Sequence, residues 1–202
     1  MTIHVPEHKA LESTSLAQIF TAARTHNAFL SKPVPDELLQ KAIELAKMGP
    51  TSANQSPLRV LFLRSAEAKE RLRPALSPGN LDKTMSAPVV AITAYDEQFY
   101  EHLPFLFPHA DAKPWFSSDP VKAARSAFQN GTLQVAYLII ALRAVGLDTG
   151  PMTGFDNAKV DSEFFPEGHV KSNVLINIGY GDHEKLFPRS PRFSFDQIAK
   201  II

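Results

Sequence analysis

The sequence predicts a single layered domain of the α+β or α/β class. Three mostly apolar runs, each long enough for a buried strand, lie at residues 58–63, 88–95 and 173–180. Helical patterns of unequal length separate these runs, and no internal repeat or low-complexity segment interrupts them. A chain of 202 residues can bury one sizeable core. Strands and helices in this mixture are expected to pack in layers around that core.

Helices are predicted where apolar residues recur with the period of an amphipathic helix. Ser15 can cap the first helix, because its hydroxyl can accept a bond from a free backbone N–H of the first turn. Gly49-Pro50 stops the second helix and Gly146 ends the longest, which would span roughly 40 Å. The expected helices cover residues 16–24, 36–48, 66–76, 120–145 and 157–164, a short strand is expected at 147–149, and a turn or short helix closes the tail.

Residues 1–14 are expected to form a flexible leader, followed by one domain over 15–202. The leader contains charges and no apolar run, which excludes a signal peptide. The most apolar stretch, Val135 to Val145, is interrupted by Arg143 and is too short to cross a bilayer. We therefore expect a soluble, cytoplasmic protein.

Charge and cysteine content exclude several classes of function. The 21 basic and 21 acidic residues balance, so neither nucleic acid nor a membrane surface is expected as a partner. The chain has no cysteine, which excludes disulfides, thiolate metal sites and a cysteine nucleophile. Its seven histidines are scattered along the sequence, so no metal site is expected. Neither a phosphate-binding glycine fingerprint nor a serine nucleophile elbow occurs.

The second half of the 120–145 helix carries information about assembly. From Leu133 onwards it is apolar nearly all round, which indicates burial on several sides or packing against a second subunit. A chain of this length has few other elements to cover such a surface. We therefore expect a two-fold homodimer across this helix, with the tails exchanged.

The loop Pro50 to Pro57 is the most informative stretch of the chain. It joins a helix to a buried strand and is dense in short hydrogen-bonding side chains, among which we single out Ser52, Ala53 and Asn54. Loops at such junctions often carry function on a rigid scaffold. An ordinary connector is the alternative.

Two basic clusters could bind an anion. Arg24-Thr25-His26-Asn27 combines a guanidinium fork with a hydroxyl and an amide, a set that suits phosphate oxygens. The alternative is a solvated arginine at a helix C-terminus, where it favours the helix dipole. Arg189-Ser190-Pro191-Arg192 is a second phosphate clamp or a surface pair.

Three further segments admit two interpretations each. Asn80 and Lys83 lie one helical turn apart and could contact a polar ring edge, or could be surface residues. Gly150-Pro151-Met152-Thr153-Gly154 would let a flat ring approach the backbone, or is a strand-to-helix turn. The aromatic residues of 99–116 are core packing or a ligand lid.

Taken in order, these motifs resemble the FMN-dependent nitroreductase family over about residues 16–200. Within that family they look most like the malonic semialdehyde reductases of the pyrimidine-utilisation pathway. The similarity lies in Ala23 to Asn27, Gly49 to Asn54, Leu106 to His109, Gly150 to Phe155 and Asn177 to Asp182. The chain departs from the family pattern at Ala23 and Asn27, which replace basic residues, at Ser56 and Leu58, which replace Gln and Trp, and at Thr153, which replaces Glu.

The resemblance implies a nitroreductase-like α+β fold, with a central, mostly antiparallel sheet flanked by helices and a long buried helix at the dimer interface. It implies FMN as cofactor and NADH or NADPH as electron donor. Donor and acceptor would use the same flavin face in a ping-pong cycle, which needs no nucleophile or carboxylate pair in the protein.

The resemblance also implies a role for each candidate site residue. Arg24, Thr25 and Asn27 would lie on the FMN phosphate and ribityl chain, with His26 alongside. Ser52 and Asn54, with Ala53 between them, would come from the partner subunit. The remaining residues would contact the flavin ring or the phosphate. Asn80 would lie at the pyrimidine edge of the flavin and Lys83 near the nicotinamide or the flavin. Pro151, Met152, Thr153 and Gly154 would lie near the flavin N5, and Arg189 and Arg192 on the phosphate.

The function implied is reduction of malonic semialdehyde to 3-hydroxypropionate. Lys83 or an arginine would hold the distal carboxylate, and His26, His109 or water would donate the carbonyl proton. The alternatives are a broad nitroaromatic or quinone reductase, whose aromatic 99–116 segment would stack on flat substrates, and a non-catalytic flavin-binding protein.

Overall fold

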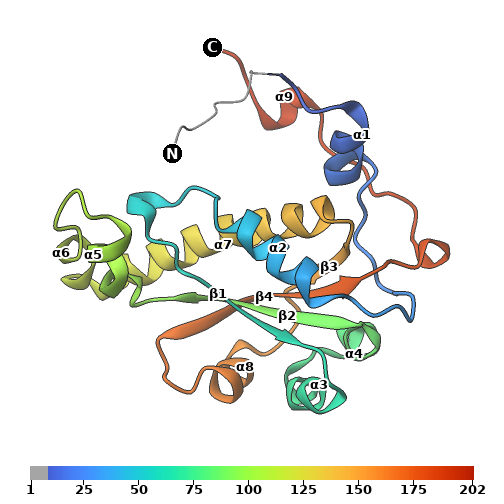
Figure 1. The fold of residues 1–202 in the computed structure, drawn as a ribbon, viewed down its shortest axis with the longest axis horizontal. Coiled ribbons are helices and arrows are strands. Elements are labelled where there is room, and N and C mark those ends of the chain that lie inside the picture. The colour runs from blue at the N-terminus through green and yellow to red at the C-terminus, as the bar shows by residue number, and fades with distance from the viewer. Residues whose placement is uncertain (1–8) are drawn as a thin grey trace.

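A four-stranded antiparallel sheet forms the centre of the computed structural model, which describes residues 9–202 (Figure 1). The strand order is β1-β2-β4-β3, so β2 and β4 are central. This confirms the predicted α+β class and the mostly antiparallel sheet. The strands are β1 (Leu58–Leu63), β2 (Val89–Asp96), β3 (Asp148–Met152) and β4 (Val170–Gly179).

Helices cover both faces of this sheet. Figure 1 shows α2 and α7 on one side and α3, α4 and α8 on the other. The helices are α1 (Ser13–Leu16), α2 (Asp36–Ala46), α3 (Ala66–Leu72), α4 (Pro78–Ser86), α5 (Leu103–Leu106), α6 (Pro114–Ser117), α7 (Pro120–Ala144), α8 (Asn157–Phe164) and α9 (Phe195–Ile198). Among residues 9–202, no helix combines the length and apolar character that crossing a membrane requires.

Strand β2 is apolar at successive positions because both of its faces are buried. Val89 and Ala91 belong to the core under α2 and α7, whereas Val90 and Ile92 belong to the core under α3 and α8. Successive side chains of a strand point to opposite faces, and helices cover both faces here. The prediction of a buried strand is therefore confirmed, with its end one residue later, at Asp96.

The first helix differs from the prediction. It begins at Ser13, continues as a π-helical turn over Ala17–Thr21, and ends before Arg24. The following segment is extended because it pairs with the edge of the sheet: the backbone N–H of His26 donates to the carbonyl of Thr149 at 3.0 Å. Of the expected leader, residues 1–8 lie outside the described part of the chain.

Strand β3 is longer than predicted. It includes Gly150, Pro151 and Met152, part of the segment for which a strand-to-helix turn and a ring-binding backbone are the two interpretations. Proline is tolerated because β3 is an edge strand and needs fewer backbone donors. The absence of a side chain at Gly150 lets the segment with His26 approach β3, since a Cβ atom at Gly150 would lie 2.4 Å from the carbonyl oxygen of His26. The close neighbour that requires a glycine here is therefore the backbone of His26.

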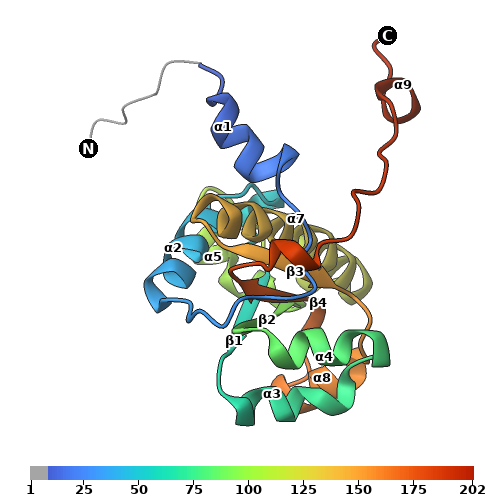
Figure 2. The same ribbon diagram turned by 90° about the vertical axis from the view of Figure 1, so that its right-hand side faces the viewer.

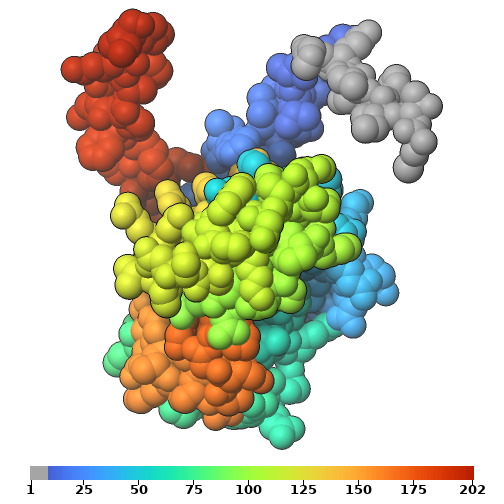
Figure 3. All heavy atoms as spheres, turned by 90° about the vertical axis from the view of Figure 1, so that its left-hand side faces the viewer, coloured from blue at the N-terminus to red at the C-terminus, as the bar shows by residue number. Residues whose placement is uncertain are grey.

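The aromatic segment forms a satellite core at one end of the molecule, where Figure 3 shows it in yellow-green. Phe99 and Phe116 pack together within it, with ring centroids 4.9 Å apart. Phe105 and Trp115 remain exposed. The segment therefore combines core packing with an exposed aromatic surface.

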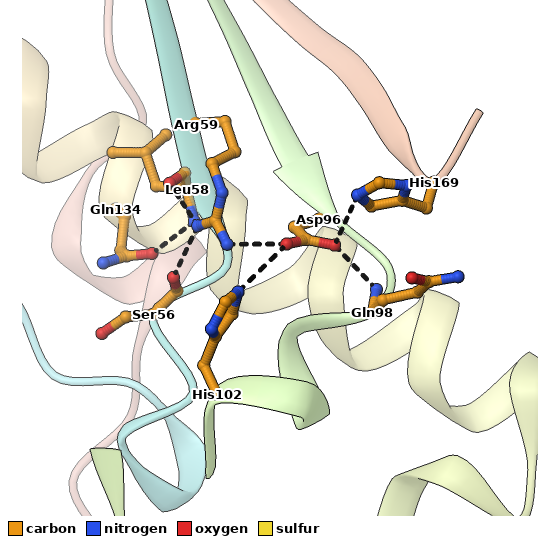
Figure 4. A network of polar contacts seen from close by, with 8 residues as sticks. All are labelled: Ser56, Leu58, Arg59, Asp96, Gln98, His102, Gln134 and His169. Carbon is orange, nitrogen blue, oxygen red and sulfur yellow. Dashed lines mark hydrogen bonds and ion pairs between the residues drawn. The ribbon is translucent and has the colours of Figure 1, made fainter. Parts of the chain in front are cut away.

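A network of hydrogen bonds and ion pairs around Asp96 connects the sheet to the aromatic segment (Figure 4). The buried carboxylate of Asp96 accepts a hydrogen bond from Arg59 at 2.6 Å and another from the backbone N–H of Gln98 at 2.8 Å. The Nε2 atoms of His102 and His169 lie 3.9 and 4.0 Å from the same carboxylate. The network joins β1, the end of β2, the aromatic segment and the residue before β4.

We expect Gly150→Ala to destabilise the fold by about 1–3 kcal/mol, because the new methyl group would collide with the backbone of His26. Gly79→Ala is the matched control. A Cβ atom at Gly79, in α4, meets no atom within 4 Å, so its effect should stay within about 1 kcal/mol. Urea unfolding of both variants measures the difference. Equal stability of the two would contradict the importance of this close approach.

Candidate anion-binding site

A cavity of about 640 Å³ opens between the segment after α1 and the start of the C-terminal tail. Figure 2 shows α1 and the C-terminal tail rising from the body of the molecule. The C-terminal end of α7 supplies a third wall through Arg143. The cavity is lined by Phe20, Thr21, Ala23, Arg24, Thr25, Asn27, Arg143, Phe187, Pro188, Arg189, Ser190 and Arg192.

Positive charge dominates this cavity. Its lining contains four arginines and no acidic residue. Within residues 9–202, none of the four makes an ion pair; their guanidinium groups donate to backbone carbonyls instead. Arg189, for example, donates to the carbonyls of Thr21 and Ala23, each at 2.9 Å. Four uncompensated guanidinium groups around one cavity favour an anion with several oxygens, such as a phosphate.

Arg143 is the most deeply placed of the four. Its Nε atom is buried and has no hydrogen-bond partner, although Nη1 donates to the carbonyl of Ile19 at 3.2 Å. Burial lowers the pKa of this guanidinium, against an opposing effect from Asp148, but an arginine remains charged at any ordinary pH. A buried positive group with an unused donor is what an anionic ligand would satisfy.

The two predicted basic clusters therefore meet in one cavity. Arg24, Thr25 and Asn27 lie on one wall, and Arg189 and Arg192 on the other. The sequence motifs alone could not show that the two clusters face each other, and their role in binding an anion stays a prediction.

Lys83 and Asn80, both on α4, extend the site along the sheet. The Lys83 ammonium donates to the side-chain oxygen of Asn27 at 3.4 Å, which places it beside the cavity. The Asn80 amide donates to the carbonyl of Gly154 at 2.8 Å. Helix α4 thus connects the anion-binding cavity to the turn that contains Thr153 and Gly154.

Within that turn the residues have different roles. Thr153 is exposed, whereas the Met152 side chain is buried and accepts a hydrogen bond from Thr84 at its sulfur, at 3.5 Å. Pro151 is paired in β3 opposite Ile176. The side chains of Met152 and Pro151 therefore belong to the core and the sheet, and only Thr153 and Gly154 lie in the turn itself.

His26 points away from the cavity. Its side chain is 1% exposed and its Nε2 atom lies 3.4 Å from a carboxylate oxygen of Asp148. Burial is the main cause that lowers its pKa; His183 and Arg24 act in the same direction, and Asp148 opposes them. From this position the ring cannot reach a substrate in the cavity. The expected role of the His26 side chain as a proton donor is therefore not supported by its position. Only the backbone of His26 contributes to the shape of the cavity wall.

The loop Ser52–Asn54 lies far from the cavity within one chain. The Ser52 backbone N–H donates to the side chain of Asn130 at 2.8 Å, and Asn54 donates to the Leu106 carbonyl at 2.8 Å. Along α7, Asn130 is roughly 20 Å from Arg143. Figure 1 shows the loop at the α5 end of α7, opposite the α1 end. Its contribution to this cavity from a partner subunit stays a prediction.

Sequence reasoning missed Arg143, Phe187, Asp148 and His183. The sequence could have indicated Arg143, because a lone arginine in an otherwise apolar helical stretch needs a partner or a cavity. No sequence pattern could have indicated Asp148 and His183, because only the folded structure brings them close to His26.

Comparison with known proteins identifies the family. A family model described as "Nitroreductase family" matches residues 21–180. A protein of Burkholderia lata with the provisional name NADH dehydrogenase/NAD(P)H nitroreductase is 59% identical over 191 residues, covering 95% of this chain and 98% of the relative.

Solved structures agree at the level of the fold. A nitroreductase family protein from Streptococcus pneumoniae has a TM-score of 0.78 at 23% identity, covering 93% of this chain and all of that one. A structure from Exiguobacterium sibiricum, provisionally named a nitroreductase and in complex with FMN, has a TM-score of 0.82 at 19% identity, covering 96% of this chain and all of that one.

Proposed function

The chain belongs to the nitroreductase family, and we propose that it is an FMN-dependent NAD(P)H oxidoreductase. The observation that carries this proposal is the cavity with four arginines and no acidic residue, next to the polar corner formed by α4 and the Thr153-Gly154 turn. The name of the Burkholderia relative, an NAD(P)H nitroreductase, supports the same activity.

The donor set of this cavity fits FMN. Arg24, Arg143, Arg189 and Arg192 would hold the phosphate, with Thr25 and Asn27 beside the ribityl chain. The ring would extend towards a second group of residues, Asn80, Lys83, Thr153 and Gly154. When bound, FMN supplies the hydride chemistry between a nicotinamide and an acceptor, while the protein binds and orients the reactants.

We propose malonic semialdehyde as the acceptor, reduced to 3-hydroxypropionate. Within the described chain, Lys83 makes no ion pair, and its hydrogen bond to Asn27 is long. Its charge is therefore available to hold the distal carboxylate of a semialdehyde. With His26 buried, the proton for the carbonyl oxygen is left to water or to the exposed His109, which lies at the α5 end of α7 and would therefore have to come from a second copy of the chain.

A flat nitroaromatic or quinone acceptor is the second candidate. The exposed aromatic rings of Phe105 and Trp115 favour it, since such rings stack on flat substrates; both lie at the α5 end of α7, so they would reach the cavity of a second copy. The two candidates differ in charge, and only the anionic semialdehyde depends on a cation that holds its carboxylate.

We propose that the protein acts as a homodimer across α7. Leu133 on this helix is 50% exposed, and Tyr137, one turn further along the same face, is 41% exposed. A partner packed there would cover these side chains. It would also bring a second copy of the Ser52–Asn54 loop, which one chain holds away from its own cavity.

The first test is an anaerobic visible spectrum of the protein with FMN, before and after NADH or NADPH. We expect a bound flavin whose absorbance bleaches with at least one of the two donors. Arg192→Ala should weaken FMN binding roughly tenfold or more, because it removes a charged donor. Arg71→Ala, which breaks an exposed ion pair outside the cavity, should not. Bound FMN that neither donor reduces would favour a non-catalytic binding protein, and no FMN binding would refute the proposal.

Replacing Lys83 by Met should raise the KM for malonic semialdehyde about tenfold or more, because the carboxylate loses its cation. The rate at which NADH or NADPH bleaches the flavin should change much less. Lys83→Arg, which keeps the charge, should restore part of the affinity. Steady-state and stopped-flow measurements separate the two effects. An equal loss in both, or unchanged KM, would exclude Lys83 from this task.

Light scattering at micromolar concentration should give twice the mass of the 22.3 kDa chain. Leu133→Glu should shift the protein towards monomer, because it places a charge in the proposed apolar contact. Glu67→Lys on α3, a charge change on the other side of the sheet, serves as the control. A monomeric wild-type protein would contradict the dimer.

A further inference from the structure

Three side chains with metal-binding atoms converge behind the wall of the cavity. They are His26, Asp148 and His183, and one ligand atom from each lies within 4.8 Å of the others. His26 comes from the extended segment after α1, Asp148 begins β3, and His183 lies in the turn after β4. The two imidazole rings stand edge to face, with centroids 5.1 Å apart.

His26 lacks the partners that a buried imidazole needs. Both of its ring nitrogens are buried without a well-formed hydrogen bond, and the side chain is 1% exposed; the Asp148 carboxylate and the backbone of Asp182 are the polar groups beside the ring. A buried polar atom without a partner is costly, and one in a native structure calls for an explanation. A bond from one ring nitrogen to a metal ion provides it.

Asp148 is held in a suitable orientation. Its Oδ2 atom accepts a hydrogen bond from the backbone N–H of Gly181 at 2.9 Å, and its Oδ1 atom lies 3.4 Å from His26 Nε2. Two ligands each at 2.0–2.1 Å from a tetrahedral metal ion are about 3.4 Å apart. The observed separation therefore matches two ligands of one ion. Gly181 acts as an outer partner that orients the carboxylate.

We propose that His26, Asp148 and His183 bind one divalent transition-metal ion of the zinc class. Two imidazoles and a carboxylate are a donor set that zinc accepts, with water in the fourth position. His183 is exposed, so its side chain can rotate to close the site and leaves a path to solvent.

The ion would join three separate parts of the cavity wall. The segment with His26 carries Arg24 and Asn27, and the turn with His183 leads into the tail that carries Arg189. Fixing these segments to the start of β3 would stabilise the folded chain, since the unfolded chain does not present the three ligands together. This proposal does not depend on the identity of the anion in the cavity.

The test uses the full chain, purified without a histidine tag and stripped with a chelator, and titrated with ZnCl₂ by calorimetry. We expect one ion per chain and a rise in Tm of several degrees. Titration with CoCl₂ should give the visible absorption of four-coordinate cobalt. These readouts need neither FMN nor activity, so their failure is separate from failure of the proposed reaction.

His183→Ala is the decisive variant, because His183 is exposed and its loss should leave the fold intact. It should weaken Zn²⁺ binding at least tenfold and abolish both the rise in Tm and the cobalt spectrum. His102→Ala, which removes another exposed histidine near a carboxylate, is the matched control and should bind as the wild type does. No binding by the wild type, or equal binding by His183→Ala and wild type, would overturn the proposal.

Discussion

The structure depends on one pairing, in which the extended chain after α1 lies along the end of the sheet. His26 donates its backbone N–H to Thr149 at the edge strand, and Leu30 donates to Tyr180 beyond the end of β4. The missing side chain of Gly150 permits the first contact. Because this pairing is extended, alternate residues point in opposite directions. The ring of His26 is thus buried against Asp148, while its neighbours Thr25 and Asn27 line the cavity.

The cavity concentrates positive charge in a protein whose formal net charge is zero. Its arginines are held by backbone carbonyls, which fix their direction without neutralising them. Asp148 is the nearby carboxylate, and it faces His26 rather than the cavity. Repulsion among the arginines opposes folding of the empty site. A bound anion removes that repulsion and gains charge-assisted hydrogen bonds, so the same arrangement that weakens the free protein favours phosphate binding.

Local patterns predicted most of the fold and part of the site. The β1 and β2 strands, the long helix and α8 follow from apolar periodicity and stop signals, which act over a few residues. The end of the first helix and the length of β3 did not follow, because each is decided by pairing between distant segments. The basic clusters were visible as sequence motifs. Their meeting with Arg143, and the approach of His183 to His26, depend on tertiary structure that no local spacing encodes.

The loop before β1, residues 50–57, has a strained backbone although it lies away from the cavity of its own chain. Ala53, Asn54 and Ser56 all have positive φ angles, which side chains with a Cβ atom rarely adopt. The strain persists because the buried Gln55 side chain and the hydrogen bonds to Asn130 and Leu106 hold the loop on both sides. Strain held in this way is commonly found at sites that contact ligands. The loop is roughly 20 Å along α7 from the cavity of its own chain, so its strain is consistent with our proposal that it completes the cavity of a second copy.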